Sequence, residues 1–180
     1  INIRLELYTL KSTGVVRRID GLGRIVIPKE IRRNLGIRDG ENMEIFTEND
    51  SIILKKYYRM RANSDLASSL CELVYNSFNY KIIITDREKI IAYAGLSSDI
   101  KGHLLNNEYL QIIEAREIKT RENTSLSFGE YTLNGNFVFI PIISLNDSIG
   151  LIIMYSESPL KDEIVVGKLI ASIFSQKLDI

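Results

Sequence analysis

The first third of the chain most constrains its fold. It contains the pattern of four short strands and one helix within roughly fifty residues, too few for a self-sufficient hydrophobic core. Asp20-Gly21 is a turn signal between the first two strands. Pro28 suits the first turn of a helix, and Gly36 is placed to end that helix. The expected order is β-β-α-β-β, with strands at residues 13–19, 24–27, 43–47 and 51–55 and a helix at residues 29–35.

A second copy of the chain is the simplest way to complete such a core. Cys71 is the single cysteine, so no disulfide within the chain can stabilise this half. His103 is the single histidine and has no clustered cysteines, which argues against a zinc site. We therefore favour an intertwined dimer in which the strands of two chains complete one another's sheets. The alternative is a monomer in which this half docks on the second half.

The charges are divided unevenly between the two parts of the chain. The whole sequence has 23 Lys or Arg and 23 Asp or Glu, a net charge of zero. Residues 1–61 hold 13 basic and 8 acidic residues, a net charge of +5, and the remainder holds 10 and 15, a net charge of −5. This asymmetry suggests a basic module joined to an acidic one, each with its own partner.

The second part of the chain has the pattern of an α+β domain with an antiparallel sheet. Two runs of apolar residues around residues 144–148 predict a strand hairpin. We expect helices from about residue 64 and from about residue 161, because apolar residues recur there at helical spacing. The other expected elements are strands at 81–85, 90–94, 137–143 and 149–155, a helical stretch at 97–118 and a loop at 119–127.

The overall composition excludes several classes of protein. Hydrophobic residues make up 45% and charged residues 26%, as in soluble globular proteins. The longest apolar runs, such as residues 151–155, fall far short of the ~20 residues of a membrane-spanning helix. No export leader is apparent, so we expect a cytoplasmic protein without a membrane partner.

The basic residues of the first half are its candidate functional residues. Neighbouring residues on a strand point to opposite faces, so Arg17 and Arg18 cannot both face a core. Guanidinium groups bind phosphate oxygens through paired hydrogen bonds, which favours a nucleic-acid partner. The alternative is that these are solvated charges paired with Asp20, Glu30 and Glu41. The candidates for DNA binding are Lys11, Arg17, Arg18, Arg24, Lys29, Arg32 and Arg33.

The basic residues of the first half belong to one long and specific motif. Residues 11–37 read K-S-T-G-V-V-R-R-I-D-G-L-G-R-I-V-I-P-K-E-I-R-R-N-L-G-I. This segment, with its continuation to Tyr57, resembles the swapped-hairpin DNA-binding domain of AbrB-type transition-state regulators. The resemblance implies an interleaved homodimer that binds double-stranded DNA. The DNA-contacting arginines of that family match Arg17, Arg24, Arg32 and Arg33, and Arg18 stands at a basic position.

The whole chain resembles sporulation regulators in which this domain precedes a GAF domain, a sensory fold. The resemblance rests on element order, length and pieces such as residues 141–143 and 149–150. It implies a nucleoid-associated tetramer that activates and represses late spore-formation genes, with a preference for A·T-rich or deformable DNA sites. The runner-up interpretation is an antitoxin-like interaction protein, because the swapped-hairpin fold also occurs there.

These resemblances divide the chain into four parts. Residues 1–10 are an unassigned extension and residues 11–57 the DNA-binding domain. Residues 58–63 are a linker, and residues 64–180 are the GAF-like sensory and oligomerisation domain.

The resemblance to GAF domains also predicts a pocket for an unidentified small molecule. Such a pocket needs apolar walls with few polar anchors. Aromatic residues at strand spacing are the candidates, although simple core packing is the stronger alternative. The candidate wall residues are Tyr93, Phe128, Tyr131, Phe137 and Phe139.

No catalytic group, metal site or cofactor is expected. Cys71 lies among the apolar positions of a predicted helix, which indicates a buried side chain rather than a nucleophile. No arrangement of Ser, His and Asp or of paired carboxylates stands out.

Overall fold

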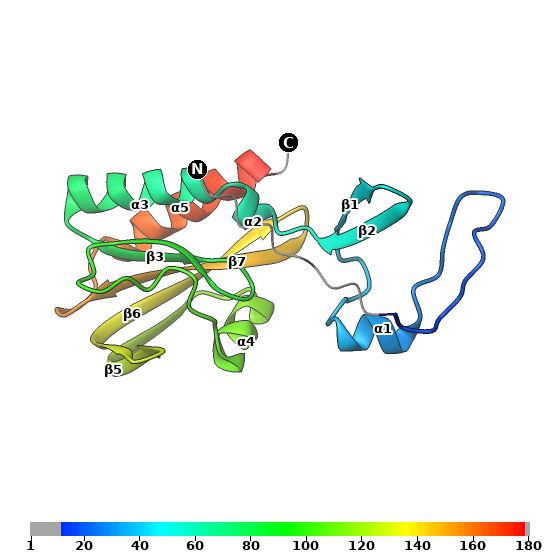
Figure 1. The fold of residues 1–180 in the computed structure, drawn as a ribbon. Coiled ribbons are helices and arrows are strands. Elements are labelled where there is room, and N and C mark those ends of the chain that lie inside the picture. Colours follow the sequence, from blue (N-terminus) through cyan, green and yellow to red (C-terminus); the bar gives the residue numbers. More distant parts are fainter. Residues whose placement is uncertain (1–11, 179–180) are drawn as a thin grey trace, which may run out of the picture. The chain divides into compact units, whose positions relative to one another are not determined.

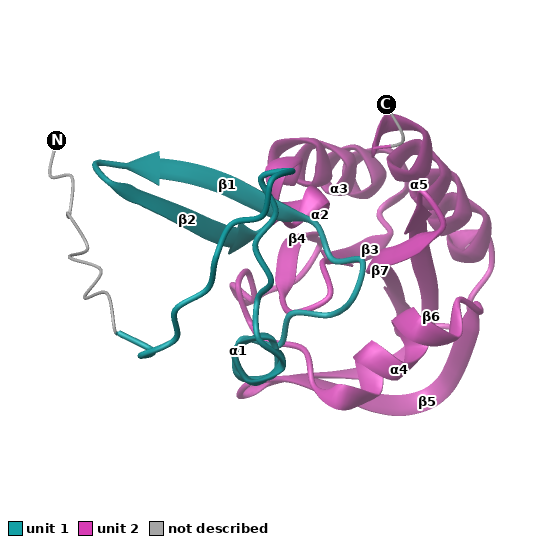
Figure 2. Ribbon diagram, turned by 90° about the vertical axis from the view of Figure 1, so that its right-hand side faces the viewer, with its two compact units in different colours: residues 1–56 teal, residues 57–180 magenta. Residues whose placement is uncertain are grey.

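The computed structural model describes residues 12–178, and Figure 1 shows the course of the chain. The chain divides into two compact units, residues 1–56 and residues 57–180 (Figure 2). No helix among the described residues is both long and apolar enough to span a membrane.

The described part of the first unit, residues 12–56, contains one short helix and one hairpin. Helix α1 (Lys29–Asn34) follows Pro28 and ends before Gly36, whose φ of +60° lies in the left-handed region that glycine adopts without strain. Strands β1 (Met43–Glu48) and β2 (Ser51–Lys56) pair antiparallel, with Met43 opposite Lys56 and Glu48 opposite Ser51. The predicted helix and the second predicted hairpin are therefore confirmed.

The first predicted hairpin does not form strands within the single chain. Residues 13–19 and 24–27 run on either side of a turn that is closed by the Gly23 amide donating to the Asp20 carbonyl over 3.0 Å. The Asp20 amide also donates to the Arg24 carbonyl over 3.0 Å. A strand requires a hydrogen-bonded neighbour, and no other described segment of this unit supplies one.

The first unit has no buried core of its own. No residue from 12 to 56 is buried. Large apolar side chains are instead open to solvent, with Val16 86%, Val26 73% and Ile45 67% exposed. This agrees with the expectation that so short a segment cannot bury a self-sufficient core.

The second unit is a five-stranded antiparallel sheet covered by helices on both faces. The strand order is β4-β3-β7-β6-β5. Helices α3 and α5 cover one face of the sheet and α4 the other (Figure 1). The elements are α2 (Arg59–Ala62), α3 (Ser64–Phe78), β3 (Lys81–Thr85), β4 (Ile90–Ala94), α4 (Asn107–Ala115), β5 (Lys119–Phe128), β6 (Tyr131–Ser144), β7 (Asp147–Ser156) and α5 (Glu163–Leu178).

Apolar side chains that point alternately to the two faces of the sheet form two separate cores. On β6, Val138 and Ile140 join the core beneath α3 and α5, whereas Phe137 and Phe139 join the core beneath α4. Because successive strand residues point to opposite faces, central strands that are apolar on both faces need a helical layer on each side. The predicted α+β domain with an antiparallel sheet is therefore confirmed.

Two local predictions for the second unit were wrong. Residues 119–127, expected to be a loop, form most of β5. Residues 97–118, expected to be helical, contain only the nine-residue helix α4. Hydrogen bonds to β4 hold part of this stretch in another conformation, because the Gly102 amide donates to the Ile90 carbonyl over 2.8 Å.

The predicted linker is an ordered part of the second unit. Residues 58–63 include α2, whose Met60 is only 1% exposed within the core beneath α3 and α5. The Arg61 guanidinium pairs with Asp86 and, over 2.8 Å, with Glu88. Burial of Met60 and these ion pairs hold the segment in place within the second unit.

Candidate nucleic-acid interface

The turn after the first extended segment positions Arg24. One oxygen of the Asp20 carboxylate accepts hydrogen bonds from the Leu22 and Arg24 amides, each over 2.9 Å. The other accepts from Arg24 Nε over 2.8 Å. The bond from the Arg24 amide, followed by that from its side chain, holds the pKa of Asp20 below its usual value. The Arg24 side chain is 72% exposed and remains accessible to a large partner.

Arg17 and Arg18 lie on the extended segment before this turn. Both are exposed, and Arg17 Nη1 donates to the Val16 carbonyl over 3.1 Å. Neither has an acidic partner among residues 12–178.

Helix α1 supplies the remaining described candidates. Lys29 and Arg33 are exposed, and neither has an ion-pair partner in the described part of the chain. Arg32 pairs with Asp39, and its Nε is buried without a hydrogen-bond partner among those same residues. Lys11 lies outside the described residues.

The carboxylate partnerships that would argue against a nucleic-acid interface are few and exposed. Asp20 pairs with Arg24, but Glu41 lies 4.0 Å from Lys56, which is not one of the candidates. Glu30 has no ion pair within the described ranges. An exposed ion pair is weak because water screens its charges, so a phosphate group can displace the carboxylate from Arg24.

The candidate ligand-binding aromatic residues separate into two groups. Phe128, Phe137 and Phe139 are buried at 1% exposure or less and belong to the core beneath α4. Tyr131 lines a pocket of about 570 Å³ with Lys81 and Tyr155, among other residues. Tyr93 is half-buried and donates to Asp99 over 3.1 Å, and burial followed by this bond raises its pKa. The three phenylalanines are thus core residues and do not line this pocket.

The role of Asp20 in ordering the turn and holding Arg24 was not predicted from the sequence. The Asp20-Gly21 turn signal could have identified it, because an aspartate side chain commonly accepts from backbone amides two residues further along. The pairing of Arg32 with Asp39 had no such signal, since the contact depends on the path of the chain after α1.

Two family models match the chain, one for each unit. Residues 64–179 match the C-terminal transcription factor family of stage V sporulation protein T. Residues 16–61 match the antidote-toxin recognition family of the bacterial antitoxin MazE. Stage V sporulation protein T of Bacillus subtilis (strain 168) is 34% identical over 169 residues, which cover 86% of this chain and 90% of that protein.

The chain belongs to the stage V sporulation protein T family. As in the resemblance drawn from the sequence, its first unit is also similar to the transition state regulatory protein AbrB of Bacillus subtilis (strain 168). The two are 56% identical over 48 residues, which cover 27% of this chain and 50% of AbrB.

The second unit has the fold of GAF domains. The GAF domain of an Acinetobacter phosphoenolpyruvate-protein phosphotransferase superposes with a TM-score of 0.52 at 16% identity, covering 64% of this chain and 79% of that domain. This member of the stage V sporulation protein T family therefore joins an AbrB-type domain to a GAF-like domain, as the sequence predicted.

Proposed function

We propose that this protein is a homo-oligomeric DNA-binding transcriptional regulator that activates and represses late spore-formation genes. The observation that carries the proposal is a first unit with exposed cations and no core of its own, joined to a GAF-like second unit. Its site of action is the cytoplasm, on the nucleoid. No step of this function requires a catalytic group.

Dimerisation through the first unit is supported by the β1–β2 hairpin. Ile45 pairs with Leu54 on one face of the hairpin, and Phe46 pairs with Ile53 on the other. A two-stranded hairpin with apolar residues on both faces is at best marginally stable alone in water. A second copy of the chain, interleaved with the first, would cover both faces and give residues 13–19 and 24–27 strand partners.

DNA binding is supported by the cations that this unit leaves exposed. Arg17, Arg18 and Arg33 have no acidic partner among the described residues, and the pair that engages Arg24 is exposed. A two-fold assembly would double this set. Phosphate contacts position such a protein on the duplex, and its preference would then come from how readily A·T-rich sequence narrows or bends.

The test is the salt dependence of binding to duplex DNA. If ~6–8 phosphates are neutralised per dimer, the logarithm of the affinity falls with the logarithm of salt concentration with a slope of roughly −5 to −7. The Arg24→Ala variant removes one cation from each protomer and should weaken binding to all sequences by tenfold or more, with a shallower slope. Genome-wide footprinting of both proteins would identify the sites.

A matched control separates this role from a general loss of charge. Lys168 is an exposed cation on α5 of the second unit, and Lys168→Ala should leave DNA affinity unchanged. Equal affinities of the wild type and the Arg24→Ala variant, with the dimer intact, would refute the role of Arg24.

The second unit is proposed to bind a small molecule in the pocket that Tyr131 lines. The Tyr155 hydroxyl donates to the Asn134 carbonyl over 3.0 Å, and Lys81 pairs with Glu157, so polar anchors are already ordered there. Mass spectrometry of metabolites that co-purify with the full chain tests this part. A Tyr131→Ala variant that retains the same metabolite at the same occupancy would argue against this location.

An antitoxin-like role is the second candidate function, because residues 16–61 match an antitoxin family. Antitoxins with this fold typically end in a disordered toxin-binding tail, whereas this chain continues into a second unit with two cores. Co-purification of a toxin would favour the antitoxin role. Salt-sensitive DNA binding without such a partner would favour the regulator.

A further inference from the structure

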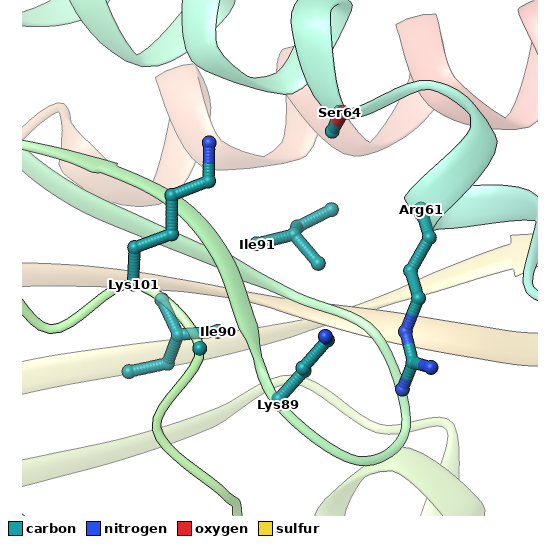
Figure 3. Close-up of a pocket in the computed structure, with 7 residues that line it drawn as sticks. Arg61, Ser64, Lys89, Ile90, Ile91 and Lys101 are labelled. Atoms are coloured by element: carbon teal, nitrogen blue, oxygen red, sulfur yellow. The ribbon is translucent and has the colours of Figure 1, made fainter. Parts of the chain in front are cut away.

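A second pocket, of about 220 Å³, lies beside the edge strand β4 and is lined by basic side chains (Figure 3). Arg61 comes from α2, Lys89 from the turn before β4, and Lys101 from the segment after β4. In Figure 3 these three side chains surround Ile91, with Ser64 at the start of α3 nearby. None of the described residues that line the pocket is acidic.

Backbone hydrogen bonds fix the segments that carry the two lysines against one another. The Ile90 amide donates to the His103 carbonyl over 3.0 Å, and Gly102 donates back to Ile90 over 2.8 Å. Lys89 forms an isolated bridge with Leu104. The segment that carries Lys101 is therefore tied to the start of β4, and both lysines lie at the pocket because of the main chain.

The polar groups of the two lysines and of Ser64 are not used within the described structure. Neither ammonium group has an ion-pair partner among residues 12–178. The Ser64 hydroxyl has no hydrogen-bond partner in the same part of the chain. Lys89 is half-buried and Lys101 is exposed, and an anion in the pocket that both line would be attracted to each ammonium group.

Arg61 is engaged differently from the two lysines. Its Nε donates to Asp86, its Nη2 donates to Glu88 over 2.8 Å, and its guanidinium stacks 3.6 Å above the Tyr58 ring. The fork of a guanidinium binds carboxylates and phosphates alike, and here Asp86 and Glu88 already engage it. The free donors are ammonium and hydroxyl groups, which suit the several oxygens of a phosphate.

We propose that this pocket binds a small phosphate-bearing anion, held by Lys89 and Lys101 with the Ser64 hydroxyl as an additional donor. Ile91 forms its apolar floor. Its volume is below the ~300–1,000 Å³ of pockets for drug-sized ligands, so the ligand is inorganic phosphate, pyrophosphate or a short phosphate ester rather than a nucleotide. The site is separate from the pocket at Tyr131, and the inference does not depend on DNA binding.

The experiment follows the isoleucine δ1-methyl NMR signals of the full chain during titration with pyrophosphate at constant ionic strength. The Ile91 signal, assigned with an Ile91→Val variant, should shift and saturate. The double variant Lys89→Gln/Lys101→Gln should weaken binding at least tenfold. Lys119→Gln, an exposed lysine on the opposite edge strand β5, should bind as the wild type does.

Because the Ile91 signal reports on this pocket, the test is independent of the proposed DNA binding. The arginines of the first unit also attract phosphate, so the Arg24→Ala variant is titrated as well and should retain the full Ile91 response. Absence of a saturable Ile91 shift, or an equal shift in the double lysine variant, would overturn the site. A shift as strong with succinate as with pyrophosphate would overturn the assignment to phosphate.

Discussion

Asp20 and Arg24 are joined by both the main chain and the side chains of one exposed turn. The carboxylate orders the turn through the Leu22 and Arg24 amides while it also engages the Arg24 guanidinium. The first of these roles needs only a hydrogen-bond acceptor. The second needs a negative charge, which a nearby DNA phosphate would repel.

Replacement of Asp20 by asparagine separates these two roles. In Asp20→Asn, the amide oxygen can still accept from the Leu22 and Arg24 amides, but the competing charge is gone. We expect duplex affinity at low salt to rise by about two- to fivefold, because an exposed ion pair is weak and its loss frees the Arg24 guanidinium. Fluorescence anisotropy with labelled DNA measures the change. Weaker binding by this variant would mean that the carboxylate orients Arg24 in the complex.

Cys71 and Tyr109 make the stability of the second unit sensitive to alkaline pH. Burial, with a smaller effect of Glu72, raises the pKa of Cys71 from 9.0 to about 12. Burial, with a smaller effect of Glu108, raises the pKa of Tyr109 from 10.0 to about 12. Because the folded chain keeps both protons longer than the unfolded chain, their contribution is complete below pH ~9 and is lost as the pH rises toward 12.

Urea unfolding at pH 8 and pH 10.5 tests this effect for Cys71. The free energy of unfolding should decline by about 1.4 kcal/mol per pH unit where only the unfolded thiol ionises, or about 2 kcal/mol over this interval. The Cys71→Ala variant should lack that part of the decline, whatever its stability at pH 8. Parallel declines for both proteins would contradict the burial of the thiol.

Some residues of the candidate sites could be identified from the sequence and others could not. The arginines of the first unit were identified from their local pattern and from the resemblance to AbrB-type domains, and both signals lie in a short stretch of sequence. The phosphate pocket was not, because Arg61, Lys89 and Lys101 are brought together only by tertiary packing. The partners of Arg61 at Asp86 and Glu88 likewise depend on where α2 packs.

Among the elements, α2 is very short and still contributes a buried side chain to the core. This four-residue helix places Met60 in the core beneath α3 and α5, at 1% exposure. Met60→Ala should therefore lower the free energy of unfolding of the second unit by about 2–5 kcal/mol. Leu104→Ala is the matched control, because Leu104 is 76% exposed and its truncation leaves no cavity. Equal stabilities in urea unfolding would show that α2 is a connector after all.

The elements that were predicted correctly carry their pattern in their own residues. β3 and β4 are short apolar runs on either side of a polar turn, and both were predicted with their observed bounds. β5 was missed because an edge strand buries little: most residues from 119 to 127 are polar and exposed, and only the pairing with β6 makes them a strand. Residues 13–19 and 24–27 have strand composition but no partner within the described chain, so composition alone could not determine their state.

The two units of the molecule differ in how far each can fold alone. The second unit buries two cores on either side of its sheet, whereas residues 12–56 bury none. For the first unit, folding and association should therefore be a single process. For the second unit, association is an additional step that leaves its own cores intact.

We expect the second unit to associate through the outer faces of α3 and α5. Leu73 on α3 is 59% exposed, and Val165 and Leu169 on α5 are 65% and 60% exposed. Val165 and Leu169 are four residues apart, so they share one side of α5, while Ile170 and Phe174 face the core. Pairing of these faces between two dimers would produce the proposed tetramer.

Leu169→Glu tests this assembly, because a carboxylate buried at an apolar interface without a partner is strongly unfavourable. We expect a tetramer for the wild type and a dimer for the variant in sedimentation velocity at the same protein concentration. Leu104→Glu, which places the same charge on an exposed loop residue, should remain tetrameric. Since Leu169 lies in the second unit, the Leu169→Glu dimer should keep the salt-dependent DNA binding of the first unit. A tetrameric Leu169→Glu protein would place the contact between dimers on another surface, and a dimeric wild type would refute the tetramer itself.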